Sequence, residues 1–558
     1  MKNKTVSRIL AAALSVLLLA GCAQSTPQDD PPAPADPGES VTDPEPVTEP
    51  KETRLELGFS GASTSDQEIT VNFAADSVNT VLPGIFGANV SWRGNGYGQW
   101  DPETNAPDAT LLEMLKNSGV THMRYPGGIE GDYFHWNESI GEDRLLQVDP
   151  FSSEYPTWDD HDGVEYMATF GPDEFLELCK AADNGVTIQL NAGNGTPEEA
   201  ADWVRHYLEK NADVWSFCVG NEVCMDEERV EGMTVTCTPQ EYVEFYNKVY
   251  EDLGDLVNDL EFGAIGITPS HKLCKYRNWD YTILSELGDK IDFIDVHIGY
   301  TPYFVGDATD EQIIKCLLAT SQWVRKLLDE EIDLINKYSN GNQDNISIQI
   351  TEWGPISKYS RSVAASVYMA SFLDTVLAEP KVSSACYLPL INHYNGANLL
   401  GALVDERVTG EKVYWENCNS YVFRWYAEQT GRSVLNSDTS GGKTFDAAPV
   451  GLIPAIDGVR EGEAAVYYDQ ASRKGTLFVV NKSYEQNTVF HLNLPFETFT
   501  VDAVTELWNE DSGAYNDYST PDVVAPSTYE AGMTVSGGRL RVEAKPVSIL
   551  KIDFSVAG

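Results

Sequence analysis

The chain has 558 residues, a length that exceeds one ordinary domain and favours a large domain joined to a second module. It has 86 acidic and 38 basic residues, and the resulting formal charge of −48 argues against nucleic acid and anionic lipid as partners. The same charge makes a polyanionic glycan a poor substrate, unless the binding cleft is locally basic.

The N-terminus has the pattern of a bacterial lipoprotein signal peptide, which we assign to residues 1–22. Basic residues precede the apolar run 9–20, which is too short to be a stable membrane span. The run ends in Leu19-Ala20-Gly21-Cys22, so we expect cleavage before Cys22 and lipid attachment to its sulfur. The alternative is an ordinary secretory signal with an incidental cysteine. We therefore expect an exported protein that is anchored by lipid to the bacterial cell membrane or surface.

The next two segments connect this signal to the folded part of the chain. Residues 23–66 are rich in proline and acidic residues and almost free of aromatic residues, so we interpret them as a disordered tether. Residues 67–79 include the alternating run EITVNF. We expect this run to join a sheet formed by the C-terminal part of the chain, which would bring the two ends of the folded part together.

Strand-like and helix-like segments alternate eight times between residues 80 and 431. The strand-like segments are short, apolar and rich in β-branched or aromatic residues, as is typical of buried parallel strands. Two of the helices begin with a capping-box pattern, Thr196 with Glu199 and Thr238 with Glu241. Eight βα units predict a (β/α)8 TIM barrel. The strand-like segments are 82–90, 121–126, 186–192, 214–222, 262–267, 292–300, 346–355 and 383–391.

The pattern changes after Gly431. Residues 432–558 consist of short alternating segments separated by turn residues. They predict a C-terminal antiparallel β-sandwich domain.

Two of the barrel segments present a glutamate at the strand end. The fourth ends in Asn221-Glu222, and the seventh contains Glu352-Trp353. One such glutamate alone would more often belong to an ion pair. Because the C-terminal ends of barrel strands meet at one mouth, we expect Glu222 and Glu352 to face each other there, with carboxyl groups roughly 5 Å apart. Two glutamates in this arrangement predict cleavage of a glycosidic bond.

Retaining hydrolysis needs one protonated and one ionised carboxyl group. Glu222 suits the acid/base role, because the amide of Asn221 can bind a sugar hydroxyl next to the reacting carbon. Glu352 suits the role of nucleophile, with Arg124 and the hydroxyl of Tyr300 keeping it ionised and aimed. The residue types alone leave the opposite assignment of the two glutamates open.

Other residues at the strand ends complete the expected sugar-binding site. Simpler roles remain open for some of them: an ion pair for Arg124, a helix cap for Asn191 and a wall residue for His297. No spacing of cysteine and histidine residues suggests a zinc site, and we expect neither a metal nor another cofactor. The substrate-binding candidates are Arg124, Asn191, Asn221, His297, Tyr300 and Trp353.

Several of these motifs resemble those of the α-L-arabinofuranosidases of glycoside hydrolase family 51. The run RYPGG at 124–128 and the stretch 133–136 look like the second-strand motif of that family, and segment 193–210 resembles its third helix. Gly220-Asn221-Glu222 matches its acid/base motif, and Thr351-Glu352-Trp353 is similar to its nucleophile motif. The resemblance covers roughly residues 68–558 and implies acid/base Glu222, nucleophile Glu352 and sugar contacts from Arg124, Asn221 and Tyr300.

The sequence also departs from the family pattern. The family usually carries a sugar-binding glutamate after the first strand, where this chain has Ser91, and an asparagine after RYPGG, where this chain has Ile129 followed by Glu130. The nucleophile is followed by Trp-Gly-Pro instead of Trp-Asn. These changes spare the catalytic pair and affect the sugar-binding subsite. The alternatives are therefore a xylosidase, glucuronidase or endoglucanase of the same clan of retaining barrel hydrolases, clan A, or a surface lipoprotein that binds glycans without cleaving them.

Overall fold

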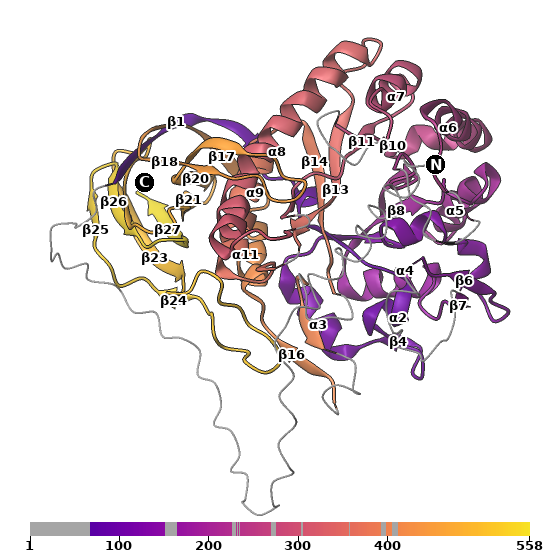
Figure 1. The fold of residues 1–558 in the computed structure, drawn as a ribbon, viewed down its shortest axis with the longest axis horizontal. Coiled ribbons are helices and arrows are strands. Elements are labelled where there is room, and N and C mark those ends of the chain that lie inside the picture. The colour runs from indigo at the N-terminus through magenta and orange to yellow at the C-terminus, as the bar shows by residue number, and fades with distance from the viewer. Residues whose placement is uncertain are drawn as a thin grey trace, which may run out of the picture.

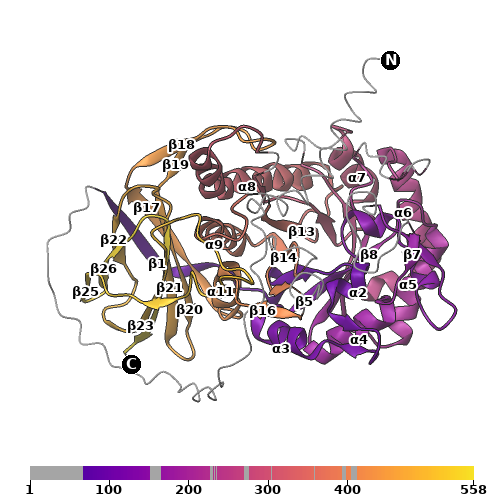
Figure 2. The ribbon, with the colours of Figure 1, turned by 60° about the horizontal axis from the view of Figure 1, so that its bottom comes forward.

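The protein has a parallel barrel and a β-rich domain that lie against each other (Figures 1 and 2). The computed structural model describes residues 67–150, 165–225, 230, 233, 235–268, 275–302, 305–356, 358–391, 398–403 and 411–557. In this part of the chain, no helix combines the length and the apolar character that crossing a bilayer requires.

The barrel is a closed ring of parallel strands, which confirms the predicted (β/α)8 architecture. Each strand pairs with the next along the chain, and β14 pairs with β2 to close the ring. A short strand, β12 (Tyr300–Thr301), pairs in parallel with the C-terminal end of β13. The ring strands are β2 (Gly87–Asn89), β5 (His122–Tyr125), β8 (Gly185–Leu190), β9 (Val214–Val219), β10 (Phe262–Ile265), β11 (Phe293–Asp295), β13 (Ser347–Pro355) and β14 (Val382–Tyr387).

A helix follows each ring strand and covers the outside of the barrel. Because water is excluded from both faces of the sheet, β8 and most of β9 and β13 are buried along their length, as their apolar sequences require. The covering helices are α3 (Ala109–Ser118), α4 (Pro172–Ala182), α5 (Pro197–Glu209), α6 (Pro239–Leu253), α7 (Trp279–Leu287), α8 (Asp310–Tyr338), α9 (Val363–Leu377) and α11 (Cys418–Ala427).

The two predicted capping boxes have different outcomes. At α6, Thr238 accepts from the amide of Glu241, and the Glu241 carboxylate accepts from the amide of Thr238, so the box is complete. At α5, Thr196 accepts from the amide of Glu199, but the Glu199 carboxylate bonds to His135 at 3.0 Å instead. The second box is therefore only half formed, because a neighbouring loop offers the carboxylate a stronger partner.

The C-terminal domain is a ten-stranded sheet in the order β24-β23-β27-β21-β20-β17-β1-β22-β26-β25, which curls around its own apolar core. Its first strand, β1 (Glu68–Thr80), lies between β17 and β22 and precedes the whole barrel in sequence. The domain is not purely antiparallel, since β1 and β22 run parallel. The remaining strands are β17 (Ser433–Gly441), β20 (Gly462–Asp469), β21 (Lys474–Asn481), β22 (Thr488–Asn493), β23 (Phe499–Leu507), β24 (Ser527–Thr528), β25 (Met533–Ser536), β26 (Arg539–Ala544) and β27 (Ser548–Val556).

The barrel and the sheet share a packed interface. Tyr426 of α11 stacks on Phe478 of β21 with 4.1 Å between ring centroids, and the Tyr467 hydroxyl donates to Asp374 of α9 at 2.7 Å. Buried residues of both parts belong to one apolar cluster. The proposed domain boundary near residue 431 falls between α11 and β17, and the two domains are docked on each other.

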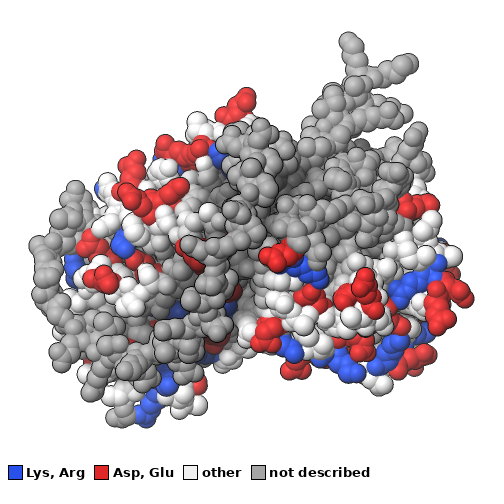
Figure 3. Space-filling view, turned by 90° about the horizontal axis from the view of Figure 1, so that it is seen from below, with Lys and Arg blue, Asp and Glu red and all other residues white. Residues whose placement is uncertain are grey.

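On the face shown in Figure 3, acidic and basic side chains are interspersed over the described surface, and no continuous basic area is visible there.

Short elements decorate the two domains. The short elements are α2 (Arg93–Tyr97), the 3-10 turns η1 (Pro83–Ile85), η2 (Ile129–Asp132), η3 (Trp136–Glu138) and η4 (Gly254–Asp259), and the strand pairs β3 (Trp100–Asp101) with β4 (Ala106–Pro107), β6 (Leu146–Val148) with β7 (Glu165–Met167), β15 (Gly401–Leu403) with β16 (Val413–Trp415), and β18 (Thr444–Ala447) with β19 (Ile456–Arg460).

Candidate active site

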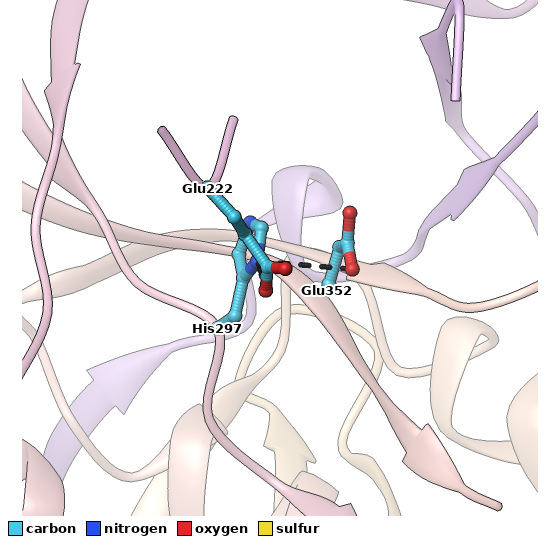
Figure 4. A group of neighbouring side chains, drawn as sticks. All are labelled: Glu222, His297 and Glu352. Carbon is cyan, nitrogen blue, oxygen red and sulfur yellow. Dashed lines mark hydrogen bonds and ion pairs between the residues drawn. The ribbon is translucent and has the colours of Figure 1, made fainter. Parts of the chain in front are cut away.

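The two glutamates meet at the C-terminal mouth of the barrel. Glu222 follows β9, and Glu352 lies in the last part of β13. One oxygen of each carboxyl group and a ring nitrogen of His297 all lie within 4.8 Å of one another (Figure 4). This separation resembles the roughly 5–5.5 Å of retaining glycosidases and is shorter than the roughly 6.5–9.5 Å of inverting ones.

The surroundings of Glu352 stabilise its ionised form. Arg124 of β5 donates to Oε1 at 2.7 Å, and the hydroxyl of Tyr300 donates to Oε2. Burial alone raises the pKa of Glu352, but the charges of His297 and Arg124 and these hydrogen bonds outweigh it and hold the pKa below its ordinary value. Glu352 is therefore an ionised carboxylate at neutral pH, as a nucleophile must be.

Arg124 connects three strand ends through one buried guanidinium group. Besides Glu352, it donates to Oδ1 of Asn89 at 2.8 Å and to Oδ1 of Asn221 at 2.6 Å. Its side chain is 0% exposed. Its contacts thus position the nucleophile and the amide of Asn221.

His297 contacts both glutamates, and its surroundings favour the form with a proton on each ring nitrogen. The single hydroxyl proton of Thr351 goes to the carboxylate of Asp295 at 2.7 Å, so the Thr351 oxygen accepts from Nε2 of His297 at 3.1 Å. Nδ1 then donates to Oε1 of Glu222 at 2.8 Å. Although burial lowers the pKa of His297, the carboxylates of Glu352, Glu222 and Asp295 raise it to about 9.

These same side chains form the one cluster in the described chain whose donor atoms are close enough together to hold a metal ion: Glu222, His297 and Glu352. A metal ligand must be a deprotonated imidazole, whereas the neighbouring carboxylates raise the pKa of His297 to about 9 and favour its protonated form. The arrangement is an ion-pair network in which the imidazolium offsets the repulsion between two carboxylates.

A small pocket opens beside this network and is lined by Asn221, Glu222, Asp295 and His297, among others. Asn221 accepts from Arg124 through its oxygen, while its buried Nδ2 has no hydrogen-bond partner in the described part of the chain. A buried donor without a partner is costly, so Nδ2 is a group that a ligand hydroxyl can satisfy.

Asn191 does not belong to this site. Its Nδ2 donates to the carbonyl of Phe134 at 3.1 Å and to Asn194 at 2.8 Å. Its Oδ1 accepts from the amides of three residues in the loop that precedes α5. The amide is thus used to hold that loop, and we do not retain Asn191 as a sugar contact.

Trp353 also points away from the mouth. Successive side chains of a strand point to opposite faces, so Trp353 faces outward where Glu352 faces the barrel mouth. Its ring is 0% exposed and stacks on Phe372 of α9 with centroids 3.9 Å apart. The prediction that Trp353 binds the sugar is therefore not retained, and its contacts indicate that it supports the nucleophile strand from behind.

The sequence reasoning missed several residues around the glutamates. Asn89, Asp295 and Thr351 anchor Arg124 and His297. Ser91, at the position where the family usually has glutamate, donates to Oε1 of Glu130 at 3.0 Å. The RYPGG glycines permit close approach here, since a Cβ on Gly128 would lie 2.7 Å from Oε1 of Glu352. Ser91 and Glu130 stood out in the sequence as departures from the family pattern, but no role was predicted for either of them.

Comparisons with known proteins agree with this geometry. Residues 114–234 match the family model described as alpha-L-arabinofuranosidase 1 domain, and residues 348–548 match alpha-L-arabinofuranosidase C-terminal domain. An intracellular exo-alpha-(1->5)-L-arabinofuranosidase of Bifidobacterium longum is 23% identical and aligns with 85% of this chain and 90% of its own. One of the same name from Streptomyces lividans is 24% identical, over 86% of this chain and 74% of its own.

Solved structures share the fold. A family 51 alpha-L-arabinofuranosidase from Bifidobacterium longum superposes with a TM-score of 0.72 at 20% identity, covering 88% of this chain and 100% of its own. An alpha-L-arabinofuranosidase from Thermotoga maritima, in complex with arabinose, gives a TM-score of 0.70 at 19% identity, covering 88% of this chain and 99% of its own.

The prediction of export and lipid anchoring is contradicted by these comparisons. Five curated relatives, including the two above, are named intracellular enzymes. Residues 1–66, with the signal pattern, Cys22 and the tether, lie outside the described residues, so no contact in the structure supports a membrane anchor. The basic residues, the apolar run and the cysteine form only a short local pattern. This pattern does not outweigh the comparisons.

Proposed function

This chain is a family 51 arabinofuranosidase-like glycoside hydrolase, and we propose that it releases terminal α-L-arabinofuranosyl residues from arabinose-containing glycans with retention of configuration. The observation that carries the proposal is the pair of carboxyl groups, Glu222 and Glu352, that come within 4.8 Å at the barrel mouth. The names of the relatives support arabinofuranose as the sugar and exo action as the mode.

In the first step, Glu352 attacks the anomeric carbon and forms a covalent glycosyl-enzyme. The hydrogen bonds from Arg124 and Tyr300 aim its oxygens and keep it ionised until the bond forms. Glu222, in its protonated form, donates a proton to the departing oxygen. His297 places a positive charge beside Glu352, which helps to keep the nucleophile ionised during this step.

In the second step, the now ionised Glu222 takes a proton from water. The water oxygen attacks the same carbon from the face that the leaving group vacated, while the bond to Glu352 breaks and frees its carboxylate. Two inversions give net retention. The hydrogen bond from Nδ1 of His297 to Oε1 of Glu222 favours the ionised form that this step needs.

We propose two sugar contacts from polar side chains close to the two glutamates. Nδ2 of Asn221 suits the hydroxyl next to the reacting carbon. The carboxyl group of Glu130, held by Ser91, is a further hydroxyl acceptor.

A panel of aryl glycosides tests the proposal. We expect turnover of an aryl α-L-arabinofuranoside to exceed that of the matching β-D-xyloside, β-D-glucoside and β-D-glucuronide, with the first-formed arabinose in the substrate's anomeric configuration by NMR. Faster cleavage of one of the other glycosides would assign that specificity instead. Binding of glycans without turnover of any of them would identify a non-catalytic protein.

A further inference from the structure

A buried carboxylate from another loop holds the backbone of the acid/base residue. Asp132 ends the turn η2 after β5, and its side chain is 1% exposed. Its Oδ1 accepts from the amide of Asn221 at 3.1 Å, and its Oδ2 accepts from the amide of Glu222 at 3.3 Å. One carboxylate therefore binds two consecutive amides at the tip of β9.

The neighbouring loop fixes Asp132 in this place. The amide of Asn194 donates to the Asp132 carbonyl at 3.1 Å. Gly193 packs directly on Asp132, since a Cβ at Gly193 would lie 2.3 Å from the Asp132 carbonyl oxygen. Only a residue without a side chain allows this approach, so the Asp132 carboxylate has little freedom to turn away from the two amides.

The charge of Asp132 acts on Glu222 over a short, buried path. Burial raises the pKa of Asp132 to about 7, and the charge of Glu222 also raises it, while the two amides and Arg124 lower it. The thiols of Cys218 and Cys237 also face it, but burial raises their pKa values well above neutral, so they add no charge. Because repulsion between two carboxylates is mutual, an ionised Asp132 disfavours the ionised form of Glu222.

We propose that Asp132 is a positioning residue for Glu222, which fixes its backbone through two amides and favours, by its negative charge, the protonated form that the leaving group needs. The proposal rests on the acid/base role of Glu222 in the proposed function. Asp132 thereby opposes His297, whose positive charge favours the ionised form, and the acid/base residue is held between two groups of opposite charge.

The test is the substitution Asp132→Asn, which keeps the shape but removes the charge and turns one acceptor into a donor. kcat/KM reports only the first chemical step, so it is measured for two aryl glycosides that share a sugar. One has a leaving group that needs a proton, and the other is a dinitrophenyl glycoside, which does not. We expect a loss of about tenfold or more on the first and less than about threefold on the second, since general acid catalysis supplies roughly 10²–10⁴-fold.

We also expect the alkaline limb of the pH profile of kcat/KM to move to lower pH in Asp132→Asn, because Glu222 then loses its proton more easily. Asp149→Asn is the matched control, because Asp149 is as buried as Asp132 and its carboxylate pairs with Arg93 at 2.9 Å. It should leave both the ratio between the two substrates and the alkaline limb unchanged.

Equal losses on both substrates, or an unmoved alkaline limb, would show that Asp132 only supports the loop. If Asp132→Asn does not fold, Asp132→Ser gives the same comparison, because its hydroxyl still accepts one amide in a smaller space. The substrates carry whichever sugar the wild-type enzyme cleaves fastest, so an error in the proposed arabinose specificity leaves this test intact.

Discussion

Arg124 and Glu352 form an ion pair across the barrel, with 2.7 Å between Nη1 and Oε1 and at most 7% of either side chain exposed. A buried ion pair depends on further hydrogen bonds that offset the loss of water around both groups. Asn89 and Asn221 accept from the guanidinium group, and Tyr300 donates to the second carboxylate oxygen. The nucleophile is thus held by residues from several strand ends, and its reactivity depends on each of them.

Substitution of the two glutamates should have different consequences. Glu352→Ala should lower kcat by about 10⁴-fold or more without changing the fold, because no neighbouring group can form the covalent intermediate. Glu222→Ala should retain part of the first step on a dinitrophenyl glycoside and accumulate glycosyl-enzyme, since only the second step then lacks its base. Steady-state rates and mass spectrometry of the intact protein measure both effects.

Azide distinguishes the two roles, because it attacks the anomeric carbon without a general base. Added to Glu222→Ala, it should restore turnover and give a glycosyl azide with the substrate's own configuration. If azide instead rescues Glu352→Ala with an inverted product, while Glu222→Ala gains nothing on activated substrates, the assignment of the two glutamates is wrong.

Tyr300→Phe should move the acidic limb of the kcat/KM profile to higher pH. The Tyr300 hydroxyl lowers the pKa of Glu352, so without it the nucleophile becomes protonated at a higher pH. A shift of about one pH unit is expected, since a hydrogen bond to a charged group contributes roughly 1.5–3 kcal/mol. The control is Tyr368→Phe, whose hydroxyl donates to the carbonyl of Gly299 and not to the nucleophile. An acidic limb that stays in place in Tyr300→Phe contradicts the prediction.

Glu331 of α8 should make the protein less stable as the pH rises. Its carboxyl group is buried, neither oxygen has a hydrogen-bond partner among the described residues, and burial raises its pKa to about 8. Because its folded pKa lies above its unfolded value, the folded state binds the proton more tightly, and stability falls as the pH rises from about 4.5 to about 8. The loss is on the order of 3 kcal/mol.

Glu331→Gln cannot ionise and should flatten this pH dependence, and Glu331→Met should also raise the stability at pH 8 by removing a buried polar group. Urea unfolding at pH 5 and pH 8 measures both. Glu330→Gln serves as a neighbouring control that leaves the buried carboxyl group in place. Equal pH dependence in the wild type and Glu331→Gln argues against a neutral Glu331 in the fold.

Removal of the C-terminal domain should destabilise the barrel. A chain that ends at Gly431 leaves β1 without β17 and β22 and exposes the ring of Tyr426, which stacks on Phe478. We expect a transition midpoint lower by about 5 °C or more, or aggregation, because exposing one large buried side chain such as Tyr426 alone costs roughly 1.5–3 kcal/mol. Calorimetry compares the two chains. A shortened chain that unfolds at the same temperature as the full chain shows that the docking contributes no stability.

The sequence alone determined the barrel and the location of its chemistry. Strand-like runs and helical segments follow from local residue patterns, and the C-terminal ends of parallel strands in a closed ring must converge. Glu222 and Glu352 end such runs, so their meeting at the mouth was predictable without knowledge of any contact. The same local logic predicted that Arg124 and Tyr300 stabilise the nucleophile.

Only the tertiary structure decided which neighbouring polar groups serve the site. Trp353 follows the nucleophile directly but faces Phe372, because strand side chains alternate and the ring packs in the apolar layer under α9. Asn191 lies at a strand end but is used by its own loop. Asp132 binds the amides of Glu222 and Asn221 from about 90 positions away, a contact that depends on how two loops pack on Gly193 and that no local pattern encodes.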